Sequence, residues 1–135
     1  MDEIVKILLL DSGEIELGEN FYPIDIAKKY LISPLGKVYS TKTYKIMKAQ
    51  INKPSPYKYI KLPCDDGVLR NLAIHRLVAL AFVPNMDGKR EVNHLDGNPT
   101  NNNFKNLKWV TGDENLAHAK NMGKFKKKKK NKKTS

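Results

Sequence analysis

The fold is decided by three consecutive stretches: EVNHLDGNPTNNN at residues 91–103, NLKWVT at 106–111 and ENLAHA at 114–119. The first ends an alternating apolar and polar run and then enters a loop of Asn, Asp and Gly, which favour turns. The second alternates as a β-strand does. The third follows Thr111, whose spacing to Glu114 is that of a helix capping box. The predicted order is strand, loop, strand, helix, with groups that can bind metal at both ends of the unit.

The remaining sequence predicts further segments. Short alternating runs separated by turn residues predict a small antiparallel β-sheet over residues 21–70, and its last hairpin turns at Asp65-Asp66-Gly67. Residues 71–120 hold a helix from His75 to Phe82 and then the unit above. Residues 1–20 are expected to form a strand or hairpin extension, because a β-branched-rich apolar run is followed by a turn signal. The predicted fold class is therefore α+β.

The net charge of +11 is distributed unevenly along the chain. Residues 121–135 hold eight lysines and no acidic residue, which leaves +3 for residues 1–120. This polylysine segment has too few apolar residues to pack and is predicted to be a disordered tail. Such a tail attracts polyanions by counterion release without selecting a sequence, and it also serves as a plain solubilising segment.

The other bulk properties limit the class of protein. The single cysteine, Cys64, rules out an intramolecular disulfide and a multi-cysteine zinc site. No run approaches the roughly 18 apolar residues of a membrane span. Acidic residues precede the N-terminal apolar run and no small-residue cleavage site follows it, unlike in a signal peptide. The chain is expected to be intracellular, with no membrane partner.

The motifs closely resemble those of HNH endonucleases of the phage and intron-homing type. The matching residues are HRLVA with Phe82 at residues 75–82, NHLDGN at 93–98, NN at 101–102, and NLKWVT at 106–111 followed by Asn115. Residues 30–40, YLISPLGKVYS, are similar more weakly to the small β module that precedes such domains. The resemblance implies a small antiparallel β module that contacts DNA, followed by a ββα-metal (His-Me) finger, the HNH domain. It also implies metal-dependent cleavage of double-stranded DNA.

The resemblance assigns roles to four polar residues. His94 would be the general base that activates water, a role for which a neutral imidazole with an ordinary pKa near 6.5 is suited. Asn106 would brace the loop that follows His94. Asn93 and Asn115 would hold one divalent metal per active site. His118, three residues after Asn115 on the same helix face, is either a third metal ligand, a phosphate contact or an ordinary surface histidine.

The donor types favour Mg²⁺ or Mn²⁺ over Zn²⁺, because amide oxygens are hard ligands. Two neutral amides, Asn93 and Asn115, make a weak site for a hard cation, so the scissile phosphate is expected to supply the missing charge. No small-molecule cofactor is expected. His75 is expected to have a structural role, holding its helix against the finger.

Basic residues supply candidate DNA contacts. The lysines of residues 21–70 alternate with tyrosines, a mixture that suits contacts to the phosphate backbone, although a solvated sheet face explains any single lysine equally well. The candidates are Lys37, Lys58, Arg76, Lys108 and, in the tail, Lys126.

Two functional classes remain open. The first is a metal-dependent HNH endonuclease that nicks DNA or makes site-specific, homing-type cuts. One finger per chain predicts a nick by a monomer, and a double-strand cut would need a homodimer or a second event. The alternative is a non-catalytic DNA- or RNA-binding protein that uses the finger as a scaffold and the tail for affinity. The expected setting is the cytoplasm of a bacterial or other host cell, with a phage or virus as a candidate source.

Overall fold

A computed structural model describes residues 3–121 of the chain, and it confirms the α+β class. The elements, in chain order, are α1 (Glu3–Ser12), β1 (Tyr22–Ile24), β2 (Ala27–Ile32), β3 (Val38–Ser40), β4 (Lys45–Met47), β5 (Gln50–Ile51), β6 (Lys58–Pro63), β7 (Leu69–Ala73), α2 (Ile74–Phe82), β8 (Glu91–His94), the 3-10 helix η1 (Phe104–Asn106), β9 (Leu107–Val110) and α3 (Gly112–Asn121). The lysines of the expected tail, Lys126 among them, lie outside the described residues.

The strands form three separate antiparallel sheets. The first has the order β1-β2-β3-β4, the second β5-β6-β7, and the third is the β8–β9 hairpin. The hairpin predicted at Asp65-Asp66-Gly67 is present, because Cys64 N–H donates to the Val68 carbonyl oxygen at 2.9 Å and Gly67 has a φ of +84°. The small antiparallel sheet predicted for residues 21–70 is therefore two sheets that meet around α2.

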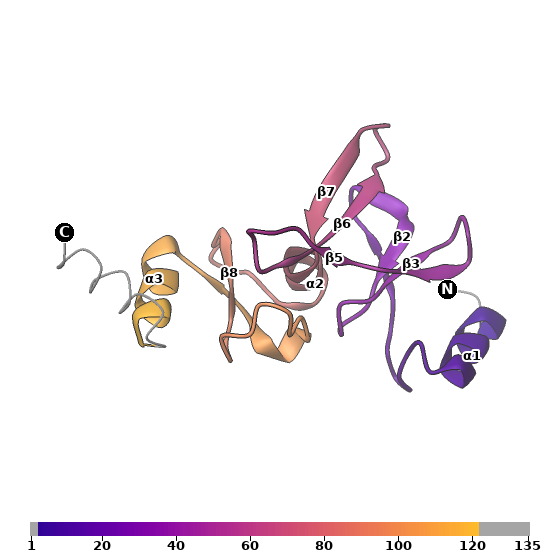
Figure 1. Ribbon diagram of the computed structural model, residues 1–135, viewed down its shortest axis with the longest axis horizontal. Coiled ribbons are helices and arrows are strands. Elements are labelled where there is room, and N and C mark those ends of the chain that lie inside the picture. The colour runs from indigo at the N-terminus through magenta and orange to yellow at the C-terminus, as the bar shows by residue number, and fades with distance from the viewer. Residues whose placement is uncertain (1–2, 122–135) are drawn as a thin grey trace.

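The main hydrophobic core surrounds α2, which contacts strands of all three sheets. Ile74, Val78 and Ala79 are almost fully buried on this helix. Their spacing puts them on one helix face, whereas Leu80 faces solvent. Figure 1 shows α1 and α3 at opposite ends of the long axis of the molecule, with α2 between them. The core thus joins the N-terminal β module to the finger.

The strand predicted within residues 1–20 is wrong, because Glu3–Ser12 is an α-helix. Short apolar runs do not distinguish a strand from a buried helix by periodicity. Leu9 packs in a second, smaller core with Ile15, Leu31 and Tyr39. Helical spacing brings Val5 to the same side as Leu9, so the helix buries Leu9 and partly buries Val5 against the first sheet.

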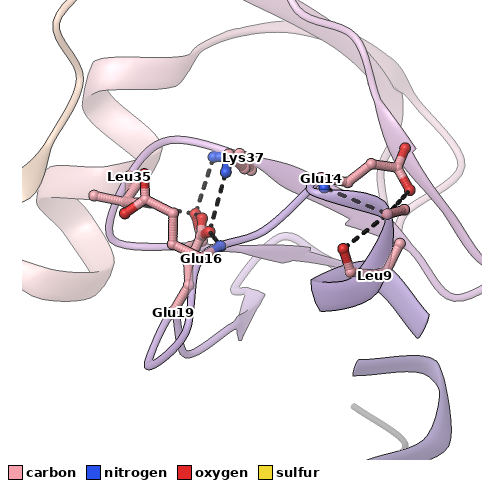
Figure 2. A network of polar contacts seen from close by, with 8 residues as sticks. Leu9, Glu14, Glu16, Glu19, Leu35 and Lys37 are labelled. Atoms are coloured by element: carbon pink, nitrogen blue, oxygen red, sulfur yellow. Dashed lines mark hydrogen bonds and ion pairs between the residues drawn. The ribbon is translucent and has the colours of Figure 1, made fainter. Parts of the chain in front are cut away.

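The turn between β2 and β3 is held by a buried carboxylate. Ser33 accepts hydrogen bonds from the backbone N–H groups of Leu35 and Lys37 through its hydroxyl oxygen, and its hydroxyl group donates to Glu19. Lys37 Nζ lies 3.2 Å from Oε1 of Glu19, whose side chain is inaccessible to solvent. Figure 2 shows Glu19 and Lys37 beside the loop that carries Leu35. The charges of Glu19 and Lys37 compensate each other, as buried charges require.

Within residues 3–121, no helix is both long enough and apolar enough to cross a bilayer.

Candidate active site

The β8–β9 hairpin and α3 form the strand, loop, strand, helix unit that the sequence predicts. In the hairpin, Asn93 is opposite Lys108 and His94 is opposite Leu107. α3 packs against both strands and begins at the predicted capping box: Glu114 N–H donates to Thr111 Oγ1 at 3.2 Å, and Thr111 N–H donates to Glu114 Oε1 at 3.3 Å. The box fixes where α3 starts, and so where its polar side chains lie relative to β8.

His94 is buried at the end of β8 and is held by one side chain of the following loop. Its Nε2 lies 2.9 Å from Oδ1 of Asn102, which is also buried. An amide oxygen is an acceptor only, so Nε2 carries the proton in the neutral ring and Nδ1 carries the lone pair. The contact therefore selects the tautomer in which Nδ1 accepts a proton. Asn102 is part of the matching pair NN at residues 101–102, but no contact with His94 was predicted for it.

Two aromatic rings pack on His94. Tyr57, which precedes β6, is nearly parallel to it with ring centroids 5.8 Å apart, and His75 of α2 lies at 5.1 Å. Burial lowers the pKa of His75 to about 4, with smaller contributions from His94 and Arg76. His75 is therefore neutral near pH 7. His75 lies on α2 and its ring contacts that of His94 in the finger, which agrees with the structural role expected for it.

Asn106 connects both ends of the loop that follows His94. Its Nδ2 donates to Asp96 Oδ1 and to the Asn101 carbonyl oxygen, both at 2.9 Å, and its Oδ1 accepts from Asp96 N–H at 3.0 Å. Asp96 also accepts from Asn101 Nδ2 and from Asn98 N–H. These hydrogen bonds lower the pKa of Asp96 to about 2. The hydrogen bonds of Asn106 to Asp96 and Asn101 agree with the bracing role expected for it.

A cleft of about 400 Å³ lies between β8, α3 and the segment before β6. Its polar lining includes Glu91, Asn93, His94, Asn115 and His118. The structure thus brings together the predicted base and all three predicted metal ligands. Pro56 and Tyr57 line the same cleft, so the N-terminal β module contributes to it.

The donors in this cleft suit a hard cation that keeps some of its water. In the described part of the chain, no three His, Cys, Asp or Glu side chains come together as a metal site, so a metal held in this cleft would need other ligands, such as amide oxygens. Asn115 Nδ2 donates to Glu91 Oε1 at 3.0 Å, which leaves the amide oxygen of Asn115 for another partner. Nε2 of His118 is buried and lacks a hydrogen-bond partner. The amide oxygen of Asn115 is a hard ligand of the kind that Mg²⁺ and Mn²⁺ take.

Glu91 also lines this cleft, and no role was predicted for it from the sequence. It lies two positions before Asn93 on β8, so strand alternation puts both side chains on the same face. That spacing was the available signal. Its carboxylate supplies negative charge beside two neutral amides, which is the charge that the site otherwise lacks.

The candidate DNA contacts differ in their surroundings. Arg76 donates from Nη1 to the Arg90 carbonyl oxygen at 2.7 Å and its guanidinium lies 5.6 Å from the centre of the Trp109 ring. Lys37 pairs with Glu19. Lys108 is exposed on the hairpin, and Lys58 is half-buried on β6. Arg76 and Lys37 therefore already have partners within the protein.

Comparison with known proteins agrees with this geometry. Residues 72–117 match the HNH endonuclease family, and residues 19–63 match the NUMOD4 motif. An uncharacterized HNH endonuclease of Acanthamoeba polyphaga mimivirus is 35% identical over 100 residues, covering 74% of this chain and 30% of that protein. The DNA endonuclease I-HmuI of Bacillus phage SP01 is 38% identical over 94 residues, covering 70% of this chain and 53% of that protein.

One solved structure is also similar to this chain. It concerns DNA binding and cleavage by the HNH homing endonuclease I-HmuI, and it matches with a TM-score of 0.67 and 36% identity. The match covers 77% of this chain and 59% of that one. This chain therefore carries an HNH endonuclease domain, preceded by a NUMOD4 motif. It spans about half the length of I-HmuI and less of the mimivirus relative.

Proposed function

We propose that the chain is a metal-dependent endonuclease that hydrolyses phosphodiester bonds of double-stranded DNA, nicking one strand per active site. The observation that carries this proposal is the cleft in which His94, with its tautomer set by Asn102, lies with Asn93, Asn115 and His118. A binding scaffold would need neither the oriented imidazole nor the converging amides. The named relatives, a phage homing endonuclease among them, support the same function and a phage or viral origin.

In this proposal His94 Nδ1 takes a proton from water as the water oxygen attacks phosphorus. The bond from phosphorus to the leaving oxygen then breaks, and solvent protonates that oxygen. Asn106 holds the loop after His94, so the imidazole keeps its position. Burial of His94 against Tyr57 and His75 restricts rotation of the ring.

Asn93, Asn115 and His118 would hold one Mg²⁺ or Mn²⁺, with Glu91 orienting the amide of Asn115. When bound, the metal supplies a positive charge for the non-bridging and leaving oxygens. Because Asn93 and Asn115 are neutral, the DNA phosphate adds to the affinity of the site. Lys108 and Lys58 would contact the phosphate backbone. The polylysine segment would add affinity without sequence preference.

Supercoiled plasmid incubated with the protein and Mg²⁺ or Mn²⁺ tests the proposal. Relaxed circles that need metal, vanish with EDTA and vanish in His94→Ala support it. Retarded but uncut plasmid, with genomic DNA also uncut, would overturn it in favour of a non-catalytic DNA-binding protein. Cleavage that survives in His94→Ala would overturn the assignment of the base. Asp66→Asn is the control variant, because Asp66 pairs with Arg70 in the β6–β7 hairpin, away from the cleft.

A further inference from the structure

We propose that the turn Ser33–Gly36 of the N-terminal module positions the catalytic histidine of the finger, acting through Asn102. The inference rests on the proposed role of His94 as general base. It gives the N-terminal module a part in the active site that is separate from any contact with DNA. Three sets of contacts carry it: turn to Asn102, Asn102 to His94, and Glu19 to the turn.

The turn is in close contact with the loop that carries Asn102. A Cβ atom on Gly36 would lie 3.0 Å from the Cβ of Asn102 and 3.2 Å from Cγ2 of Ile74, so only glycine fits without displacing its neighbours. Its φ of +88° also favours glycine. Beside this contact, Phe104 N–H donates to the Pro34 carbonyl oxygen at 2.8 Å. The turn therefore meets the finger loop through both a van der Waals contact and a hydrogen bond.

Asn102 is held on two sides. Its Cβ faces Gly36, and its amide oxygen meets Nε2 of His94 at 2.9 Å. The residue is 5% exposed, so it has little room to choose another rotamer. A shift of Asn102 would move or release the acceptor that selects the tautomer of His94. Asn102 is thus a positioning residue, and the turn is the surface that keeps it in place.

The turn itself is rigid because of the Glu19 network seen in Figure 2. Ser33 bonds the backbone of Leu35 and Lys37, and Gly36 N–H donates to the Ser33 carbonyl oxygen at 3.0 Å. The buried carboxylate of Glu19 ties the Ser33 hydroxyl and the Lys37 ammonium together. A rigid support transmits its position to Asn102, whereas a mobile loop would not.

The test compares Gly36→Ala with Gly67→Ala. Both glycines have nearly the same positive φ, +88° and +84°, so alanine strains the backbone equally, but a Cβ on Gly67 meets nothing within 4 Å. We expect Gly36→Ala to lower the plasmid nicking rate about tenfold or more while DNA retention stays unchanged. Gly67→Ala should remain within about twofold of wild type. Both are compared at a temperature where each is folded.

Nitrogen-15 NMR of the imidazole of His94 gives a readout that does not depend on turnover. The wild type should show one tautomer, with the proton on Nε2, and Gly36→Ala and Asn102→Leu should both show a mixture. Asn102→Asp, which keeps an acceptor, should retain the single tautomer. If Gly36→Ala is unstable, Ser33→Ala loosens the turn without adding volume and should shift the same signal.

An unchanged tautomer and nicking rate in Gly36→Ala, matching Gly67→Ala, would overturn the inference. The two proposals fail separately. If the wild type does not nick DNA, the proposed function fails, yet the tautomer comparison still decides whether the turn positions His94.

Discussion

At the scale of single residues, the proposed metal site contains amides rather than carboxylates. Asn93 and Asn115 are neutral, and the nearby charge comes from Glu91, which accepts a hydrogen bond from Asn115 Nδ2. When a carboxylate accepts a hydrogen bond from the NH₂ group of an asparagine side chain, the amide oxygen of that side chain points away from the carboxylate. Glu91 therefore orients the side chain of Asn115 and would add negative charge near a metal held there, without being a ligand itself.

Replacing this carboxylate should weaken metal binding. We expect Glu91→Gln to lower Mn²⁺ affinity by roughly fivefold, about 1 kcal/mol, because it removes one charge and a charge-assisted hydrogen bond. The measurement is free Mn²⁺ by electron paramagnetic resonance, with duplex DNA bound to the protein in a His94→Ala background. Asp66→Asn makes the same charge change far from the cleft and should leave the affinity unaltered. Equal affinities in the two variants would refute the role of Glu91.

The buried His75 should make stability depend on pH. Its pKa is lowered to about 4 in the fold, against an ordinary value near 6.5. Between these values the unfolded chain binds a proton that the folded chain does not, so stability falls as the pH drops from 6.5 towards 4. His75→Phe removes this contribution. The loss of unfolding free energy between pH 7 and pH 5, measured by urea unfolding, should be about 1–2 kcal/mol smaller in His75→Phe than in the wild type. Equal losses in both proteins would contradict the assignment.

At the scale of elements, the apolar run of residues 4–10 was predicted to be a strand but forms the helix α1. A strand over residues 4–10 would place Ile7 and Leu9 on the same face, whereas the helix buries Leu9 and leaves Ile7 exposed. Packing against Leu31 and Tyr39 of the first sheet selects the helix. No property of residues 4–10 alone carries that information.

Alanine substitutions distinguish the two arrangements. Leu9→Ala should lower the free energy of unfolding by about 2–4 kcal/mol, because it leaves a cavity in the smaller core. Ile7→Ala should change it by only about 0.5 kcal/mol, as expected of an exposed site. Chemical denaturation of both variants gives the comparison. Similar large losses in both would favour a strand.

At the scale of the whole molecule, the N-terminal module and the finger share one core. Ile24 and Ile60 of the module pack in the same cluster as Val92 and Trp109 of the finger, with α2 between them. Pro34 and Gly36 add contacts from the module to the loop that carries Asn102. The two sequence motifs, NUMOD4 and HNH, thus share one hydrophobic core in this chain.

A shared core predicts a single cooperative transition. Trp109 is the only tryptophan, so its fluorescence reports on the finger, whereas far-UV circular dichroism reports on all elements. The two signals should give the same urea midpoint, the usual test of two-state unfolding. Separate midpoints would show that the finger unfolds independently, and would also weaken the inference that the turn Ser33–Gly36 supports His94.

The sequence by itself determined the finger. The Asn- and Gly-rich loop, the capping box and the alternating strands act over a few residues, so the order of elements could be inferred from local patterns, and roles for His94, Asn106 and Asn115 could be predicted from the resemblance to HNH endonucleases. The roles of Asn102, Glu91 and Gly36 could not. Each depends on contact with a side chain or turn distant in the chain, and local preference does not specify long-range contacts. The same reason explains why α1 was not predicted, since its Leu9 packs against Leu31 and Tyr39 of the first sheet.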